Sequence, residues 1–431
     1  MKEKEQVLIL SYYFPPCNLT PSERIYSWAK YLKNGDYYPI IITRNWDTKI
    51  NNSTTDAYKS SGDEVKIEKF EHYEVHYLPY KASFKDQLFI RLEGTKFYFI
   101  YLIVAFLYLL FQLVFVKYSN YGFFYHYICQ YLNQQPRITK MVVSASPYEL
   151  FGIAYWVQKK CQIKWIADYR DDWSTRDFYK DSFSKKIINI FNRYYEKKWV
   201  ASSQAIISVS AYLVQRIANL TGKKGYLMHN GYMPENYTQH YQPFDDFTIS
   251  YTGSVYASQP IEFFLDGVKK FIENKKRTCR LKVVFIGIKN EIFILNRILN
   301  NIKGYEAYFE FTTRIPKDEA IAIQAKSHLL LACSYGDFKG IPGSKLYEYI
   351  ALKKTVIVYP TDHDVIEETL LETGQGLICN HENEFLDYLN QYYTLYEQNT
   401  SANPTQFNEE AIRNYSREAQ TNELIQVLNT L

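Results

Sequence analysis

The sequence predicts an α/β protein built from two doubly wound domains. Short apolar runs alternate with helical patterns through both halves of the 431-residue chain, which is typical of stacked strand–helix units and parallel sheets. A polar connection containing Pro234 and Pro243 separates the halves. We therefore expect a first domain over 1–235 and a second over 236–407, with a C-terminal helix over about 408–431 that could pack back on the first domain.

The expected strands are short runs rich in Val, Ile, Leu and Tyr. In the first domain they cover 7–13, 38–44, 73–80, 140–147, 164–170, 205–210 and 225–231, and in the second 248–253, 281–287, 307–313, 328–333, 355–360 and 376–380. Because parallel strands share their carboxyl ends, loops from distant parts of each domain should meet at one edge of its sheet. Ligands are expected there, in a cleft where the two domains face each other.

The first strand–helix connection carries its own signals. The tetrapeptide TPSE at 20–23 predicts a capping box with proline as the first helical residue, and the helix should end near Gly35. The loop FPPCNLT at 14–20 is longer than a tight connection needs. This length favours a ligand-facing role over a purely structural one.

Composition narrows the class of protein and its compartment. The chain is 47% hydrophobic and 22% charged, as in ordinary globular proteins, and its net charge of +4 is too balanced to indicate a nucleic-acid partner. Its six cysteines form no C-x-x-C pair, which argues against a zinc or disulfide framework. The apolar run near the N-terminus is too short for a signal peptide, so we expect a cytoplasmic protein.

One apolar segment, 97–116, runs twenty residues without a charge between Lys96 and Lys117. It is long enough to cross a bilayer, but strands on both sides of it should belong to one sheet, which a lone crossing would prevent. A polar stripe recurs along it at steps of three and four, formed by Tyr98, Tyr101, Ala105, Tyr108 and Gln112. This pattern predicts a helix lying in one leaflet with the stripe toward protein or headgroups, so that the protein is peripheral or monotopic at the inner membrane face. A fully buried core helix is the alternative.

The basic stretch 184–199 is either a second lipid contact or a solvated helix face.

The stretch GIPGSKLYEYIALKKTVIVYP, 340–360, joins a glycine–proline loop, a short helix and a buried strand. Ser344 can cap the helix, and Lys345 lies beside the first-turn amides, which together suit an anion such as phosphate. Glu348 is on the same helical face, where it can accept hydrogen bonds from a ribose diol. The alternative is a surface Lys–Glu pair.

In order along the chain, several motifs resemble the retaining family 4 glycosyltransferases of the GT-B fold. They are YFPP with a downstream AKYL, SASPYELFGIAYWVQKK, IADYRDDWS, AIISVSAYL, HNGY, SYTGSVY and GIPGSKLYEYIALKKTVIV. The resemblance implies two Rossmann-like domains facing across a cleft, with a nucleotide-sugar donor bound by the second and a glycan or lipid-linked acceptor bound by the first. It further implies transfer of a sugar with retention, in bacterial surface-polysaccharide assembly.

The resemblance and the strand-end positions together assign the candidate residues. For donor binding these are Gly253, Ser254, Gly343, Ser344, Lys345 and Glu348; for catalysis Lys345 and Arg314; and for acceptor binding Arg24, Asp168, Arg170 and Asp171. The alternative for the tract IADYRDDW is a local cluster of Arg–Asp ion pairs.

The chain departs from the family pattern at three positions. The first Glu of the family's Glu-x7-Glu motif falls on Gly340, and an arginine often found after the first strand of the donor domain is Ser254. The lysine that usually follows this arginine is absent from the stretch VYASQPIEFF at 255–264. The tract TDHD at 361–364 imitates a metal-binding Asp-x-Asp, but Asp364 is more simply a helix N-cap, so no metal or other cofactor is expected. Two other functions stay open, a nucleotide-sugar epimerase with acid–base carboxylates in the cleft and a non-catalytic subunit of a polysaccharide-assembly complex.

Overall fold

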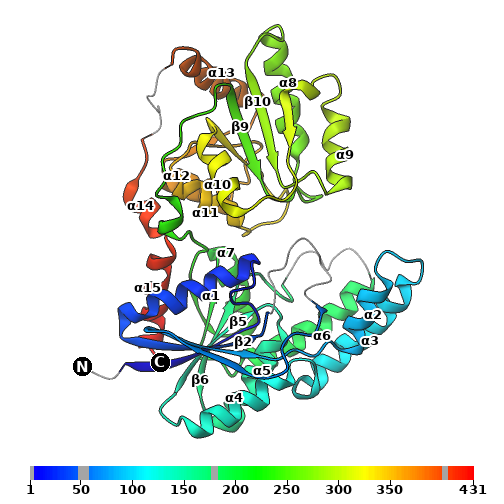
Figure 1. Ribbon diagram of the computed structural model, residues 1–431, viewed down its shortest axis with the longest axis vertical. Coiled ribbons are helices and arrows are strands. Elements are labelled where there is room, and N and C mark those ends of the chain that lie inside the picture. Colours follow the sequence, from blue (N-terminus) through cyan, green and yellow to red (C-terminus); the bar gives the residue numbers. More distant parts are fainter. Residues whose placement is uncertain (1–3, 47–57, 176–182, 400–405) are drawn as a thin grey trace. The chain divides into compact units, whose positions relative to one another are not determined.

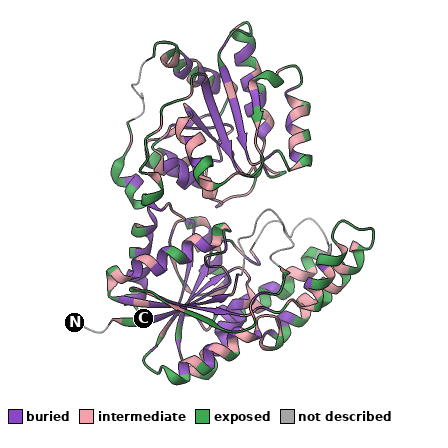
Figure 2. Cartoon of the chain, in the orientation of Figure 1, coloured by how far each residue is buried: buried purple, intermediate pink, exposed green. Residues whose placement is uncertain are grey.

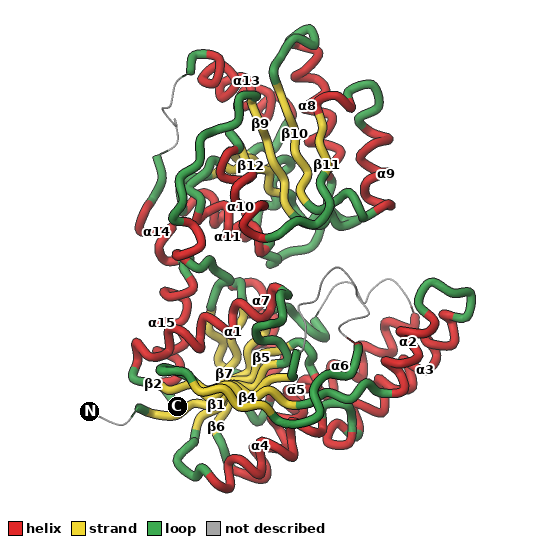
Figure 3. Tube along the Cα trace, in the orientation of Figure 1, coloured by secondary structure: helices red, strands yellow, loops and turns green. Residues whose placement is uncertain are grey.

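The computed structural model describes residues 4–46, 58–175, 183–399 and 406–431 (Figure 1). They form two compact units, Met1–His229 with Gln420–Leu431, and Asn230–Ala419. Each unit is a largely parallel sheet with helices on both faces, as the alternation of strand and helix patterns predicts (Figure 3).

The first unit contains an eight-stranded sheet in the order β3-β4-β2-β1-β5-β6-β7-β8. Its described strands are β1 (Glu5–Ser11), β2 (Tyr37–Arg44), β3 (Lys66–Lys69), β4 (Glu74–Leu78), β5 (Lys140–Ala145), β6 (Lys164–Tyr169), β7 (Ala205–Ser208) and β8 (Lys224–Leu227). Its helices are α1 (Thr20–Tyr31), α2 (Phe84–Leu92), α3 (Tyr98–Val114), α4 (Gly122–Gln134), α5 (Glu149–Cys161), α6 (Phe183–Val200) and α7 (Ala211–Thr221). Neighbouring strands pair in parallel except β3, which runs antiparallel to β4 at the sheet edge and lies in a polar stretch without a strand signal.

The second unit has a six-stranded parallel sheet in the order β11-β10-β9-β12-β13-β14. The strands are β9 (Phe247–Thr252), β10 (Leu281–Ile286), β11 (Phe309–Phe311), β12 (Leu329–Ala332), β13 (Val356–Val358) and β14 (Gly376–Ile378). The helices are α8 (Ile261–Asn274), α9 (Ile292–Asn301), α10 (Lys317–Lys326), α11 (Ser344–Ala351), α12 (Val365–Glu372), α13 (Glu382–Glu397) and α14 (Glu409–Asn414). Helix α15 (Arg417–Asn429) begins in this unit and ends in the first.

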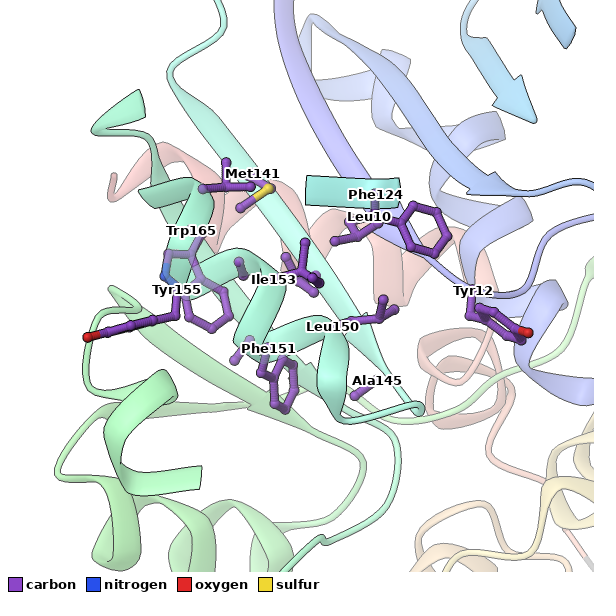
Figure 4. Packing of buried hydrophobic residues seen from close by; sticks show 14 of the residues in the cluster. Leu10, Tyr12, Phe124, Met141, Ala145, Leu150, Phe151, Ile153, Tyr155 and Trp165 are labelled. Carbon is purple, nitrogen blue, oxygen red and sulfur yellow. The ribbon is translucent and has the colours of Figure 1, made fainter. Parts of the chain in front are cut away.

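The central strands are apolar on both faces because helices cover each sheet on both sides. In β1, Leu8 and Leu10 enter one core cluster while Val7 and Ile9 enter the other, on the opposite side of the sheet. Successive strand side chains point to opposite faces, so a continuous apolar run is what such a strand requires. Figure 4 shows Leu10 among aromatic and aliphatic side chains of the larger cluster, and the central strands in Figure 2 are almost entirely buried.

The start of α1 differs from the predicted capping box. The N-cap residue is Leu19, and no side chain caps the helix. The Ser22 hydroxyl donates instead to the Cys17 carbonyl at 2.7 Å and to the Leu19 carbonyl at 2.7 Å. The hydroxyl therefore fastens the preceding loop to the helix rather than satisfying the first helical amides.

The last helix contributes to the first unit. Leu424, Ile425 and Leu428 of α15 lie in the core cluster that covers one face of the first sheet. Ile425 also packs so closely on Gly35 that a Cβ there would lie 2.5 Å from its side chain. This close approach explains why a glycine follows α1, since any larger residue would displace α15.

The apolar segment 97–116 forms α3, which ends at Val114 and is followed by a short 3₁₀ turn at Val116–Tyr118. Within the described part of the chain, no helix combines the length and apolarity that a membrane crossing demands.

Candidate functional site

The candidate donor site lies at the carboxyl edge of the second sheet, where loops follow β9, β12 and β13. Helix α11 begins there, and its N-cap residue is Gly343, without a side-chain cap. Ser344 is thus the first helical residue and not the predicted cap. The expected anion site at this helix mouth depends on backbone amides and on Lys345.

Lys345 and Glu348 form an ion pair, with 2.8 Å between Nζ and Oε1. The pair is asymmetric: the Lys345 side chain is 36% exposed, whereas that of Glu348 is 12% exposed. Glu348 is thus fixed in the unit while the ammonium group reaches solvent. A surface pair has both partners exposed, so this arrangement has more in common with a half-buried site than with the surface-pair alternative.

A buried polar network holds Glu348 from behind. The Gln324 amide nitrogen donates to the Thr252 hydroxyl at 2.9 Å and lies 3.5 Å from Oε2 of Glu348. The Tyr349 hydroxyl accepts from the Thr252 amide at 3.0 Å, and burial raises the Tyr349 pKa far above its ordinary value, so the phenol stays neutral. Sequence reasoning missed Gln324 because nothing in its helix marks one glutamine as inward-facing.

The loop after β9 brings Gly253 against Lys345. Gly253 has a φ of +111°, and a Cβ built there would lie 3.8 Å from Cγ of Lys345. The neighbouring Ser254 is exposed, and its hydroxyl donates to Oε1 of Glu291 at 2.5 Å. The structure therefore brings Gly253 and Lys345 together as predicted from the shared sheet edge, and adds an acidic residue that the sequence did not single out.

The glycine–proline loop is fastened to the start of α12. The amide of Gly340 donates to the Asp364 carboxylate, and the Lys339 ammonium donates to the Asp362 carbonyl. Asp364 occupies the N-cap position, but its side chain does not cap the helix. Asp362 does so instead, accepting from the amides of Ile366 at 2.9 Å and Glu367 at 3.0 Å. The prediction for Asp364 was thus right in position and wrong in hydrogen bonding.

The other residues predicted around the donor are more loosely placed. Arg314 is exposed in the loop between β11 and α10. In the tract TDHD, His363 is exposed and pairs with Glu367, with 3.0 Å between Nδ1 and Oε2. No group of three or more His, Cys, Asp or Glu side chains is arranged to hold a metal ion among the residues described.

In the first unit, Arg24 and Asp168 form a buried pair. The guanidinium donates to both carboxylate oxygens, at 2.7 and 3.2 Å, and the two residues are 2% and 0% exposed. Ser144 donates to the same carboxylate at 2.7 Å, and Arg24 also donates to the carbonyls of Met228 and His229. The pair therefore joins α1, β5, β6 and the end of β8, and the acceptor role of both residues stays a prediction.

The remaining acceptor candidates follow β6 at the surface. Arg170 is half-buried and Asp171 is exposed. The Tyr148 hydroxyl donates to the carbonyls of Asp171 at 3.1 Å and Asp172 at 2.9 Å, which fixes this loop. Burial raises the pKa of Tyr13, and the charge of Arg170 acts in the opposite direction.

Glu149 is a titratable group at this edge that the sequence analysis missed. It is the first residue of α5, at the carboxyl end of β5. Burial raises the pKa of its carboxyl group, while the helix amide and the charge of Lys85 act in the opposite direction. Its place in the motif SASPYELFG could have marked it, since a carboxylate in the first turn favours a strand-end helix.

Comparison with known proteins rests on three-dimensional structure. No family model and no curated protein sequence matches the chain. Sucrose-phosphate synthase from Thermosynechococcus elongatus superimposes with a TM-score of 0.62 at 12% identity, covering 99% of each chain. A glycosyltransferase from Rickettsia africae gives 0.57 at 11% identity, covering 99% of this chain and 98% of that one.

Anabaena HepE, solved in complex with UDP and glucose, gives a TM-score of 0.57 at 10% identity and covers 99% of this chain and all of the other. At such low identities, similarity establishes the fold. The chain therefore has the GT-B fold of these glycosyltransferases, as the sequence predicts.

Proposed function

We propose that this protein is a glycosyltransferase that binds a nucleotide-sugar donor at the mouth of α11. The observation that carries the proposal is the half-exposed Lys345 ammonium, held by a buried Glu348 beside Gly253. A helix N-terminus with an adjacent lysine suits a diphosphate, and a fixed carboxylate can accept from ribose hydroxyls. The fold shared with Anabaena HepE, whose structure contains UDP, supports the same ligand class.

The proposed reaction is transfer of the sugar with retention of configuration to a glycan or lipid-linked acceptor, in cell-surface polysaccharide synthesis at the cytoplasmic membrane face. Lys345 would stabilise the negative charge that develops on the leaving diphosphate, with Arg314 as the second cation. Gly253, Ser254, Gly343 and Ser344 would line the donor through their backbone. The donor phosphate can itself accept the acceptor's proton, so no dedicated protein base is needed.

A thermal-shift panel of nucleoside diphosphates and their sugars tests donor binding. A ligand that binds only the folded state stabilises it by about 2.7 kcal/mol at 100 times its Kd, which for a unit of this size raises the melting temperature by about 5–10 °C. The absence of a shift with every nucleotide at millimolar concentration would refute the donor site.

Substitutions at the ion pair then separate chemistry from binding. We expect Lys345→Ala to lower kcat on the order of a hundredfold, because one electrostatic contact to the transition state is lost, and Glu348→Gln mainly to raise the donor KM. The matched control is Lys269→Ala, which removes a lysine that pairs with a carboxylate, Asp266, at the same helical spacing of three residues. If both lysine substitutions change kcat and the donor KM by equally small amounts, Lys345 is only a member of a surface ion pair.

A second candidate, a non-catalytic binding subunit, is favoured by one observation. The position where the family resemblance implies an arginine is Ser254, and the structure pairs it with the acidic Glu291 rather than with a cation. Such a subunit would bind nucleotide sugar without consuming it. Nucleotide binding without detectable transfer or donor hydrolysis would favour this candidate over the enzyme.

A further inference from the structure

The helices α2, α3 and α6 of the first unit expose an unusual amount of apolar surface. More than half of the exposed large apolar side chains in the described chain belong to these helices and the turns that flank α3. On α3, the side chains of Phe99, Leu102, Ile103, Phe106 and Leu107 are between 37% and 60% exposed, and we call these five residues the α3 apolar face. Monomeric soluble proteins rarely expose a continuous patch of this kind without a partner.

The opposite side of α3 is fixed to the protein. The stripe that the sequence analysis identified faces inward: Tyr101 packs on Phe89 of α2 with 5.1 Å between ring centroids, and Tyr108 donates to Asn120. Gln112 is buried, and Leu113 belongs to the main core cluster. The fully buried core helix considered from the sequence is therefore wrong, since only one side of α3 is covered.

Helix α6 contacts α3 and supplies positive charge (Figure 1). Ile190 and Tyr194 are 68% and 57% exposed, and Lys186 and Lys197 lie one turn before and after them on the same helical face. The acidic residue of this helix, Glu196, is fully buried and accepts from the Ser174 amide at 2.9 Å. Among the described side chains of α6, every exposed charge is positive.

We propose that this side of the first unit docks on an anionic lipid bilayer, with α3 lying in the plane of the interface. The α3 apolar face would enter the acyl boundary, while the lysines of α6 contact anionic headgroups. A second copy of the chain is a poorer occupant, because a two-fold interface brings the same surface of each copy together and would oppose α6 cations to one another. This proposal identifies the surface through which the membrane association in the proposed function would occur, and it does not depend on whether the protein binds a nucleotide-sugar donor.

Vesicle flotation of the full-length protein tests the apolar contribution. We expect the wild type to float with phosphatidylcholine vesicles that contain phosphatidylglycerol. Changing Leu102, Ile103, Phe106 and Leu107 together to Gln should weaken this partitioning at least tenfold, because four apolar side chains no longer enter the bilayer. The matched control changes Ile292 and Phe293 to Gln, which are 72% and 76% exposed on the second unit, and should float like the wild type.

The charge contribution is tested separately. We expect Lys186→Glu with Lys197→Glu to weaken binding to anionic vesicles at least about 20-fold, since each cation near such a surface contributes about fivefold. The control pair Lys223→Glu with Lys303→Glu makes the same change in net charge at residues outside α2, α3 and α6 and should have little effect. Circular dichroism and the nucleotide-induced thermal shift of each variant show that it is folded and that donor binding is intact.

Four outcomes would overturn the inference. The first three are failure of the wild type to bind anionic vesicles, equal binding of the wild type to purely neutral vesicles, and unchanged vesicle binding by the α3 variant. The fourth is a wild type that is dimeric and an α3 variant that is monomeric, with neither protein binding lipid. The last would make a second copy the occupant. Because nucleotide shifts are recorded on the same samples, loss of the lipid result leaves the proposed donor site separately tested.

Discussion

Replacing Arg24 by Met should destabilise the first unit by about 3–5 kcal/mol, the usual cost of leaving one partner of a buried ion pair alone. Asp168 is fully buried and accepts three hydrogen bonds, two from Arg24 and one from Ser144. The substitution would leave it only the Ser144 hydroxyl. The carbonyls of Met228 and His229 would lose their Arg24 donor as well. Against a typical total of 5–15 kcal/mol, such a loss is easily measured.

Tryptophan fluorescence during urea unfolding is the assay, because all six tryptophans of the chain lie in the first unit. One of them, Trp28, has its ring 5.3 Å from the Arg24 guanidinium. The midpoint should fall while the slope stays constant. Adding Asp168→Asn should recover most of the loss, since it removes the unpaired charge but keeps a partner for Ser144.

The matched control is Arg280→Met, which breaks an exposed pair with Asp246 and should cost about 0–1 kcal/mol. Circular dichroism is needed for this control, since Arg280 lies in the second unit. A loss below about 1 kcal/mol for Arg24→Met would refute the structural role of the pair. If the same variant instead raised the acceptor KM at unchanged stability, Arg24 would belong to acceptor recognition, as the sequence analysis expects.

Two further predictions concern the second unit. Burial lowers the pKa of His328 to about 4. As pH falls through about 6.5, this side chain is therefore protonated in the unfolded chain but stays neutral in the folded one. The free energy of unfolding of the wild type should therefore fall by up to about 3 kcal/mol as pH falls from 6.5 to 4, and that of His328→Gln should fall less. Unfolding followed by circular dichroism measures both, and equal pH dependence would contradict this reasoning. Gly253→Ala should cost about 1–3 kcal/mol through backbone strain at its φ of +111°, since the added Cβ meets no atom closer than 3.8 Å, and a neutral result would show that the loop relaxes.

Much of the fold is predictable because its signals are local. The run 283–286, VVFI, is apolar at every position, as a strand covered on both faces requires, and β10 occupies Leu281–Ile286. The carboxyl-edge rule then brings Gly253 and Lys345 together without any knowledge of packing, and their side-by-side position is what the structure has. Helical periodicity likewise indicates the stripe on α3, although the sequence left open whether this stripe faces protein or lipid headgroups.

Hydrogen-bond partners were less predictable, even over short distances. The TPSE tetrapeptide fits a capping box, yet Ser22 bonds to the preceding loop. Asp364 fits an N-cap, yet it bonds to Gly340 while Asp362 caps α12. In both cases the side chain had a choice among nearby backbone groups, and the path of an adjacent loop decided it.

The sequence by itself determined most of the strands, the division into two units and the sheet edge where the candidate polar residues of each unit lie, because apolar periodicity and chain direction are properties of short segments. Only the tertiary structure decided that Arg24 meets Asp168, that Ser254 meets Glu291, and that the end of α15 completes the first core. It also decided that one side of α3 stays uncovered. These outcomes depend on which distant segments pack together. The residues next to Arg24 in sequence do not indicate that its partner, Asp168, lies 144 positions away.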